Sequence, residues 1–317
     1  MEQEHKLPES LQEAVVYFSD PRRAHAFATS LRWPDGVECP RCESKEHSFI
    51  TTRLLWFCKG CKKQFTVKVS SIFEDSPLGM DKWMMAVWLI VNCKNGISSY
   101  EIASHLKITQ KSAWFMLHRI RKALQSGSFG KLSGEVEVDE TFIGGKARNM
   151  HISKRDRRIT GTGGKDKAPV MGILERGGEV RVKVVPNRRK SALQAEVRAH
   201  VAAGSALYSD ALSSYDGLSH HYAHQVIDHA EKYVDGRVHT NGLENFWSLL
   251  KRTLGGTYVS VEPFHLFRYL DEQTYRYNNR KNTPVERFTG AMANVSGKRV
   301  TWKQVTGKQS EGETRAD

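Results

Sequence analysis

The sequence predicts a multidomain protein in which a small metal-binding module and a unit of three helices precede an α/β domain with a mixed sheet. Three observations lead to this prediction. Four cysteines form two closely spaced pairs, apolar residues then recur at helical spacing, and strand patterns finally alternate with helix patterns. The 317 residues are enough for about two domains of ordinary size.

Basic residues outnumber acidic ones, 48 against 35, which gives the chain a formal net charge of +13. A surplus of this size favours a polyanionic partner such as nucleic acid. No stretch approaches the roughly 18 apolar residues that cross a bilayer, and residues 1–10 are polar, without the apolar core of a secretion signal. We therefore expect no membrane partner and a cytoplasmic location.

Four of the five cysteines have the spacing of a zinc site, with two CxxC pairs separated by fifteen residues. They are Cys39, Cys42, Cys58 and Cys61. Two strands of a zinc ribbon are predicted between the pairs, at residues 49–50 and 54–57. Thiolates would fill all four positions around the ion, so we expect Zn²⁺ in a structural role. Disulfides are the alternative, but they do not suit a reducing cytosol.

Three helices are predicted after the cysteine module, at residues 82–93, 98–106 and 110–124. Their short connections and shared apolar face are typical of a helix-turn-helix. The third helix carries basic residues that we expect to contact DNA, namely Lys111, Arg119, Arg121 and Lys122. Three-helix units without a nucleic-acid role are common, and this alternative stays open.

Strands and helices of a larger domain follow a linker at residues 126–128. Strands at 134–142, 169–174 and 179–185 precede a helix at 191–202, a strand that ends at Asp210, a strand near 225–227 and a helix that carries Glu244. This is the element order of the RNase H-like fold. Its first and fourth strands lie side by side, so we expect Asp139 and Asp210 to be neighbours.

Asp139, Asp210 and Glu244 come from three separate elements of this domain, and they are the candidate catalytic metal ligands. Carboxylate oxygens suit hard cations such as Mg²⁺ or Mn²⁺. Two such ions about 3.5–4 Å apart can promote a displacement at a phosphodiester. Strand alternation places Glu135 and Glu137 on the same face as Asp139, so spacing alone does not select among the three.

Three segments resemble sequence blocks of the bacterial insertion-sequence DDE transposases with an N-terminal zinc ribbon: residues 136–141 (VEVDET), 208–210 (YSD) and 239–252 (HTNGLENFWSLLKR). The resemblance extends from about residue 11 to residue 280. It implies cleavage at the inverted repeats of a mobile element, followed by insertion elsewhere. It also assigns Asp139, Asp210 and Glu244 as the metal-binding triad, and it implies a bacterial protein that associates with the nucleoid when bound to DNA.

Lys251 and Arg252 follow Glu244 on the same predicted helix. Lys251 is seven residues beyond Glu244, which returns it to within roughly 20° of the same helix face. The same spacing is part of the family pattern. We therefore expect Lys251 to serve catalysis by facing the phosphates and Arg252 to contact DNA, with a solvated helix end as the alternative.

The connection at residues 144–167 is long, rich in glycine and strongly basic. Connections of more than about 12–15 residues are usually functional or disordered. We expect four of its cations to contact DNA beside the site, and the alternative is a mobile, solvated excursion. These cations are Lys154, Arg155, Arg157 and Arg158.

These expectations divide the chain into an N-terminal helix with the zinc ribbon at 1–75, a helix-turn-helix region at 76–127, an RNase H-like catalytic domain at 128–295 and a disordered tail at 296–317. The leading hypothesis is a transposase that binds double-stranded DNA and forms a homo-oligomer when it brings two element ends together. The alternatives are a nuclease of the same fold without strand transfer and a DNA-binding regulator without catalysis. The roles of His239, Asn241 and Asn245 stay open.

Overall fold

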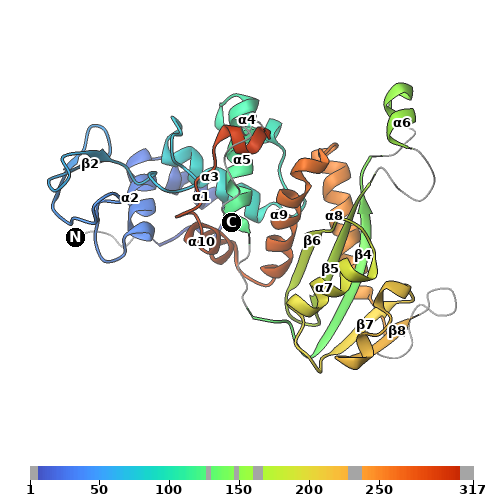
Figure 1. Ribbon diagram of the computed structural model, residues 1–317. Coiled ribbons are helices and arrows are strands. Elements are labelled where there is room, and N and C mark those ends of the chain that lie inside the picture. The colour runs from blue at the N-terminus through green and yellow to red at the C-terminus, as the bar shows by residue number, and fades with distance from the viewer. Residues whose placement is uncertain (1–5, 126–129, 146–149, 160–166, 228–237, 308–317) are drawn as a thin grey trace. The chain divides into compact units, whose positions relative to one another are not determined.

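The chain is organised as two compact units (Figure 1). The structure, a computed structural model, describes residues 6–125, 130–145, 150–159, 167–227 and 238–307. Unit 1 consists of residues 1–125 together with 281–317, and unit 2 consists of residues 126–280. The C-terminal segment therefore groups with the N-terminal modules, whereas the sequence-based boundaries placed residues 281–295 in the catalytic domain.

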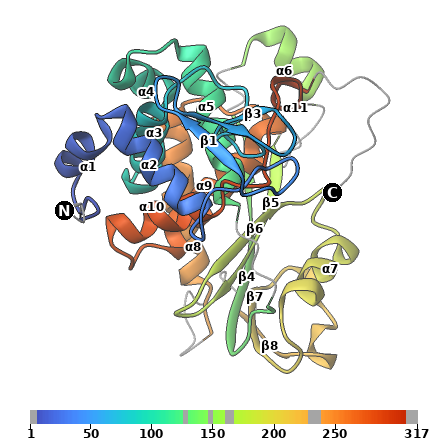
Figure 2. The ribbon, with the colours of Figure 1, turned by 90° about the vertical axis from the view of Figure 1, so that its left-hand side faces the viewer.

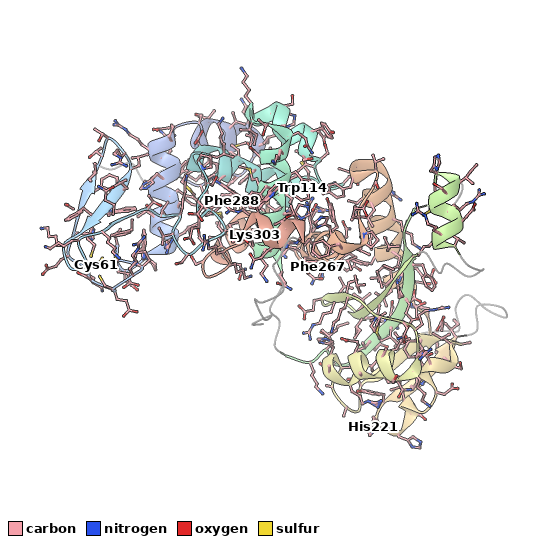
Figure 3. The ribbon with its side chains drawn as sticks, turned by 45° about the horizontal axis from the view of Figure 1, so that its top comes forward. Cys61, Trp114, His221, Phe267, Phe288 and Lys303 are labelled. Carbon is pink, nitrogen blue, oxygen red and sulfur yellow. The ribbon has the colours of Figure 1, made fainter. Side chains whose placement is uncertain are left out.

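Unit 1 contains seven described helices and a small sheet. The helices are α1 (Leu11–Phe18), α2 (Pro21–Arg32), α3 (Met80–Asn92), α4 (Ser99–Leu106), α5 (Gln110–Leu124), α10 (Pro284–Ala293) and α11 (Trp302–Thr306). α10 packs on α3, where Asn92 Oδ1 accepts a hydrogen bond from Arg287 Nε at 2.9 Å. Phe288 on α10 is fully buried and packs against the rings of Phe18, Phe27 and Trp88 (Figure 3).

The prediction of a disordered tail at 296–317 is wrong for residues 296–307, the part that the structure describes. Val300 and Val305 are buried, and α11 packs on α5. The carbonyl oxygen of Val300 accepts a hydrogen bond from Arg119 Nε at 3.1 Å. The composition of this segment is polar overall, but its two buried valines and the Val300 carbonyl oxygen attach it to unit 1. Residues 308–317 lie outside the described part of the chain.

The ribbon is a three-stranded antiparallel sheet with strand order β1-β2-β3. Its strands are β1 (His47–Ile50), β2 (Leu55–Cys58) and β3 (Gln64–Phe65). The first two strands confirm the predicted hairpin. The third was missed because it is two residues long, too short to show an alternating pattern. The rings of Trp33 and Phe65 pack against Trp56 and form the small core of this module.

The three predicted helices of residues 82–124 are present as α3, α4 and α5. α4 begins with a capping box in which Ser98 and Glu101 each bond the other's backbone N–H. The connection to α5 turns through Lys107, which adopts the left-handed conformation at φ 48°. Ile102 on α4 and Ile120 on α5 are fully buried, as the apolar periodicity predicted. The packing of three helices is thus observed, and its role in DNA binding stays a prediction.

Unit 2 is built on a five-stranded mixed sheet with strand order β6-β5-β4-β7-β8. The strands are β4 (Glu135–Ile143), β5 (Ala168–Glu175), β6 (Val180–Val184), β7 (Ala206–Asp210) and β8 (Ala223–Ile227). β4, β5 and β6 pair antiparallel, while β7 pairs parallel to both β4 and β8. The predicted adjacency of the strands that carry Asp139 and Asp210 is therefore confirmed.

Helices cover both faces of this sheet (Figure 1, Figure 2). α7 (Lys190–His200) packs on one face, α8 (Asn241–Thr253) and α9 (Leu266–Asn278) pack on the other, and α6 (Ile152–Arg158) lies in the long connection after β4. Val136 and Val138 of β4 join the core under α7. Because side chains alternate along a strand, Glu137 and Asp139 are directed to the α8 face.

Short helical turns complete the unit, namely 3-10 turns at Ser213–Tyr215, Leu218–His220 and Pro263–His265 and a π-helical turn at Leu254–Tyr258. Within the described residues of both units, no helix combines the length and the apolar character that crossing a membrane requires.

Candidate functional site

The three predicted carboxylates come together on unit 2 through its strand pairing and through α8. Glu137 of β4 pairs with Tyr208 of β7, so Asp139 and Asp210 lie two residues further along two neighbouring parallel strands. Glu244 lies in the first turn of α8, which packs on the same face of β4. The strands thus place two carboxylates and the helix brings the third.

The pKa of Asp139 is the clearest sign that these groups act on one another. This pKa is raised from 3.8 to about 6, first by burial and then by the negative charges of Asp210 and Glu244. Hydrogen bonds from the Trp247 indole and the Glu140 backbone N–H act in the opposite direction. Concentrated negative charge of this kind is what a divalent cation relieves.

Asp139 is held in a fixed orientation by two donors. Its Oδ1 accepts from the backbone N–H of Glu140 at 2.8 Å, and its Oδ2 accepts from Trp247 Nε1 at 2.9 Å. Trp247 can lie this close because Gly172, which pairs with Asp139 across β4 and β5, has no side chain. A Cβ atom at Gly172 would sit 2.7 Å from the Trp247 ring. Sequence reasoning did not single out either residue.

Glu140 is a fourth carboxyl group at this site, and it differs from the other three. Burial, followed by the charges of Asp210 and Asp139, raises its pKa to about 8, while Arg188 acts in the opposite direction. The Tyr215 hydroxyl donates a hydrogen bond to it. The raised pKa of Glu140 favours its neutral form, whereas metal binding requires the ionised form of a carboxyl group.

Arg188 begins a short basic run beside the carboxylates that sequence reasoning missed. Its guanidinium lies over the Phe142 ring, 4.7 Å from the centroid, and it acts electrostatically on Glu140. Arg189 and Lys190 follow it, and all three are exposed. The only sequence signal was the run of three cations at the start of α7. Lys251 and Arg252, predicted on α8, are exposed on its C-terminal part.

The cations predicted on α5 differ in their exposure to solvent. Lys111 is exposed and Lys122 is half-buried, so both reach the surface of the helix. Arg119 and Arg121 do not, because they are 4% and 1% exposed. Arg119 instead ties unit 1 together by donating to the carbonyl oxygens of Val300 and Glu74. The expectation that Arg119 and Arg121 contact DNA is therefore wrong, since buried side chains cannot reach a phosphate.

The cations predicted in the long connection after β4 are described in part. Arg155 and Arg157 are exposed on α6, where Arg157 Nε donates to the Ser153 carbonyl oxygen at 3.0 Å. The side chains of Lys154 and Arg158 lie outside the described part of the structure. The exposed position of Arg155 and Arg157 is compatible with DNA contact, which stays a prediction.

The four cysteines of the ribbon converge as predicted, with Sγ atoms that all lie within 4.8 Å of one another. The backbone N–H of Cys61 donates to Cys58 Sγ and, together with contacts from the other three sulfurs, lowers the pKa of Cys58 to about 6, which favours the thiolate that zinc requires. Four sulfur donors fit a structural Zn²⁺ site. Within the described ranges, no other group of three or more potential ligands converges so closely, so the carboxylates of unit 2 form a more open site.

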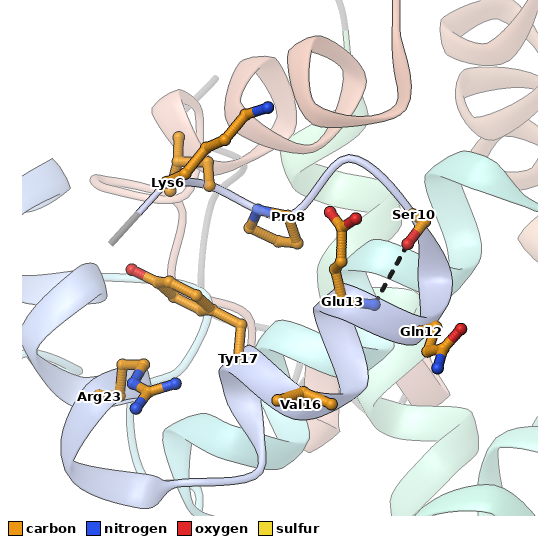
Figure 4. A pocket seen from close by; sticks show the side chains of 9 residues that line it. Lys6, Pro8, Ser10, Gln12, Glu13, Val16, Tyr17 and Arg23 are labelled. Carbon is orange, nitrogen blue, oxygen red and sulfur yellow. Dashed lines mark hydrogen bonds between the residues drawn. The ribbon is translucent and has the colours of Figure 1, made fainter. Parts of the chain in front are cut away.

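A separate pocket lies in unit 1 between the start of the described chain, α1 and α2 (Figure 4). Tyr17 and Arg23 line it, with the Arg23 guanidinium 5.5 Å from the Tyr17 centroid. Ser10, which also lines it, caps α1 by accepting from the Glu13 backbone N–H at 3.2 Å. None of the predicted site residues lines this pocket.

Comparison with known proteins gives matches in both units. The family model of the ISXO2-like transposase domain matches residues 131–278, and that of the transposase zinc-ribbon domain matches residues 19–64. An uncharacterised protein in transposable element ISH50 of Halobacterium salinarum is 28% identical over 256 residues, which cover 76% of this chain and 85% of the relative. An uncharacterised transposase-like protein of Haemophilus influenzae is 32% identical over 102 residues, which cover 32% of this chain and 82% of the relative.

The matched ranges include both sites described above. The transposase model covers the strands and helix that carry Asp139, Asp210 and Glu244, and the zinc-ribbon model covers the four clustered cysteines. This chain belongs to the insertion-sequence DDE transposases that carry an N-terminal zinc ribbon.

Proposed function

We propose that this protein binds the terminal inverted repeats of its insertion sequence and catalyses metal-dependent end cleavage and strand transfer. The observation that carries the proposal is the electrostatic coupling of Asp139 to Asp210 and Glu244, three carboxylates supplied by three elements. Coupled carboxylates in an open site are suited to hold divalent cations against a phosphodiester.

The sheet supports assignment of unit 2 to the RNase H-like fold. Its strand order β6-β5-β4-β7-β8 has an antiparallel half and a parallel half that meet at β4. Two of the three acidic residues lie on β4 and β7, at the meeting point of these halves. Open α/β sheets commonly bind their ligands where strand order changes direction.

The donor chemistry of the site suits Mg²⁺ or Mn²⁺. Both cations prefer oxygen ligands, and Asp139, Asp210 and Glu244 supply only oxygen. When bound, two such ions would activate the attacking oxygen and stabilise the leaving oxygen. Trp247 and the Glu140 backbone N–H hold Asp139 in a fixed orientation. The exposed Lys251 and Arg188 of the same unit would bind phosphate oxygens.

The proposed reaction has two displacements at phosphorus. In the first, water attacks the phosphodiester at the element end, and the bond to the 3′ oxygen breaks to leave a 3′-hydroxyl. In the second, this hydroxyl attacks a phosphodiester of target DNA, so that one P–O bond forms as another breaks. Both displacements develop negative charge on the oxygens of the phosphate under attack, so one set of residues would serve both.

Recognition of the ends falls to unit 1 in this proposal. The zinc ribbon and the helices α3 to α5 would supply sequence-specific contacts, with Lys111 and Lys122 of α5 at the DNA surface. Arg155, Arg157 and Arg252 of unit 2 would contact the backbone. Pairing of two ends before cleavage would require a homo-oligomer.

A cleavage and joining assay tests the proposal directly. The substrate is DNA that carries the gene's flanking sequences, and the proteins are the native chain, Asp210→Asn and Asp216→Asn as a matched control at an exposed carboxylate outside the site. We expect end-specific nicks and joined products with Mg²⁺ from the native and Asp216→Asn proteins and none from Asp210→Asn. Cleavage without joining would indicate a nuclease instead, and binding without chemistry would indicate a regulator.

A further inference from the structure

Arg176 lies at the centre of a buried network beside the acidic site. It follows β5 in the turn before β6, and its side chain is only 17% exposed. Its Nε donates to Glu137 Oε1 at 2.8 Å, and its Nη2 donates to the His239 carbonyl oxygen at 2.7 Å. Its guanidinium also stacks on the Tyr208 ring, 4.2 Å from the centroid. One side chain thus contacts three other segments of unit 2.

These contacts involve the three elements that carry the carboxylate triad. Glu137 precedes Asp139 by two residues on β4, and Tyr208 precedes Asp210 by two residues on β7. His239 lies just before α8, which carries Glu244. Arg176 therefore connects the segments immediately before all three acidic residues, although it is not one of them.

Glu137 completes the link to α8 by capping this helix. Its Oε2 accepts from the backbone N–H of Leu243 at 3.0 Å, in the first turn of α8, where Thr240 offers no side-chain cap. Gly242 makes this approach possible, since a Cβ atom there would lie 2.8 Å from Glu137 Oε2. The carboxylate of Glu137 is 1% exposed, so its two oxygens are committed to Arg176 and to the helix.

We propose that Arg176, acting through Glu137, is a positioning residue that sets the separation of Asp139, Asp210 and Glu244 and so the affinity of the site for divalent cations. This inference rests on the proposed function, because it assigns the triad to metal binding. A planar guanidinium suits the role, since it can bond a carboxylate and a carbonyl oxygen in fixed directions while stacking on an aromatic ring. Lysine keeps the charge but cannot make these contacts together.

The test measures Mn²⁺ binding by electron paramagnetic resonance on the full-length, zinc-loaded protein. We expect Arg176→Lys to weaken Mn²⁺ binding about 10- to 100-fold, the usual effect of changing a residue that supports metal ligands. Asp210→Asn identifies the signal of the acidic site by abolishing it. The matched control is Arg181→Lys on β6, an arginine 14% exposed that pairs with Glu179 and donates to the Gly130 carbonyl oxygen.

A second pair of variants separates positioning from simple loss of stability. Arg176→Met leaves the buried Glu137 carboxylate without its cation, and adding Glu137→Gln removes that charge while it keeps an acceptor for the Leu243 N–H. We expect the double variant to bind Mn²⁺ more tightly than Arg176→Met alone. This pair also provides the test if Arg176→Lys does not fold.

The outcomes distinguish this inference from the proposed function. Unchanged Mn²⁺ affinity in Arg176→Lys, or an equal loss in Arg181→Lys, would overturn the positioning role. Mn²⁺ binding by the native protein without DNA cleavage would overturn the proposed function, and the shift between variants would still decide the role of Arg176. A native protein that binds no Mn²⁺ would overturn both.

Discussion

The cysteine site of unit 1 and the acidic site of unit 2 arrange their potential metal ligands in opposite ways. The cysteines come from one short segment, residues 39–61, and their sulfur atoms all lie within 4.8 Å of one another. The carboxylates come from three elements between residues 139 and 244, and they do not converge so closely. A closed set of four thiolates suits a structural ion, whereas an open set of carboxylates leaves room for a substrate.

The two sites should differ most in how far the loss of one potential metal ligand disturbs the fold. Cys58→Ser should abolish zinc binding and the ordered sheet β1-β2-β3, because the binding of structural zinc contributes about 10–16 kcal/mol that folds such modules. Asp210→Asn should leave the fold and the zinc content of the chain unchanged. Zinc content and near-ultraviolet circular dichroism measure both effects.

Cys93→Ser is the control for the cysteine variant, because Cys93 lies outside the converging group. It should retain zinc. Retention of one zinc ion by Cys58→Ser, with the aromatic signal intact, would show that the ribbon folds without its metal and would remove the contrast between the two sites.

Substitution of one glycine near each site should have an intermediate effect on stability, and a larger one in unit 2 than in the ribbon. Gly172→Ala should destabilise unit 2 by about 1–3 kcal/mol, since its Cβ would lie 2.7 Å from the Trp247 ring, which is packed in the core. Gly60→Ala in the ribbon should cost less than about 1 kcal/mol, because its nearest neighbour is Ser44 Cβ at 3.1 Å, which can give way. Urea unfolding midpoints provide the measurement, and equal shifts would contradict this account.

The smallest expected effect is a gain of stability at the acidic site. The folded-state pKa of Asp139 is raised to about 6 from an ordinary value of 3.8, first by burial. The folded state therefore holds this proton more tightly, and the associated stability is present at low pH and is lost as the pH rises from about 4 to about 6. Without divalent cations at pH 7.5, Asp139→Asn should be about 1–2 kcal/mol more stable than the native protein.

The pH series supplies its own control, because the difference should vanish at about pH 2.5, which lies below the pKa of Asp139 in both the folded and the unfolded state. Urea titrations at both pH values measure it. A variant that is less stable than the native protein at pH 7.5 would mean that the hydrogen bonds of Asp139 to Trp247 and Glu140 outweigh the burial of its charge.

Local signals were predicted well from the sequence. The spacing of Cys39, Cys42, Cys58 and Cys61 predicted their convergence because a hairpin between two CxxC pairs leaves few other arrangements. The limits of α5 were also predicted to the residue, from the short connection before it and a regular apolar stripe. In each case the interactions that form the element connect residues close in the chain.

The surface of α5 shows where local signals fail. Periodicity identified its basic residues, but it gave no means of telling Lys111, which is exposed, from Arg119, which is buried. The partner that orients Arg119 is the carbonyl oxygen of Val300, 181 residues away. No pattern within the helix could indicate that residues 281–307 return to this unit.

The sequence by itself determined which kinds of metal ligand this protein carries and the order of the elements that present them. Only the tertiary structure decided which acidic residue of β4 serves which purpose. Glu137 caps α8 and pairs with Arg176, so both of its carboxylate oxygens already have partners within the protein. Asp139 instead lies near the charges of Asp210 and Glu244, and burial raises its pKa. The physical reason is that strand alternation fixes only the face of a side chain, while its partners and its pKa depend on the elements that pack against that face.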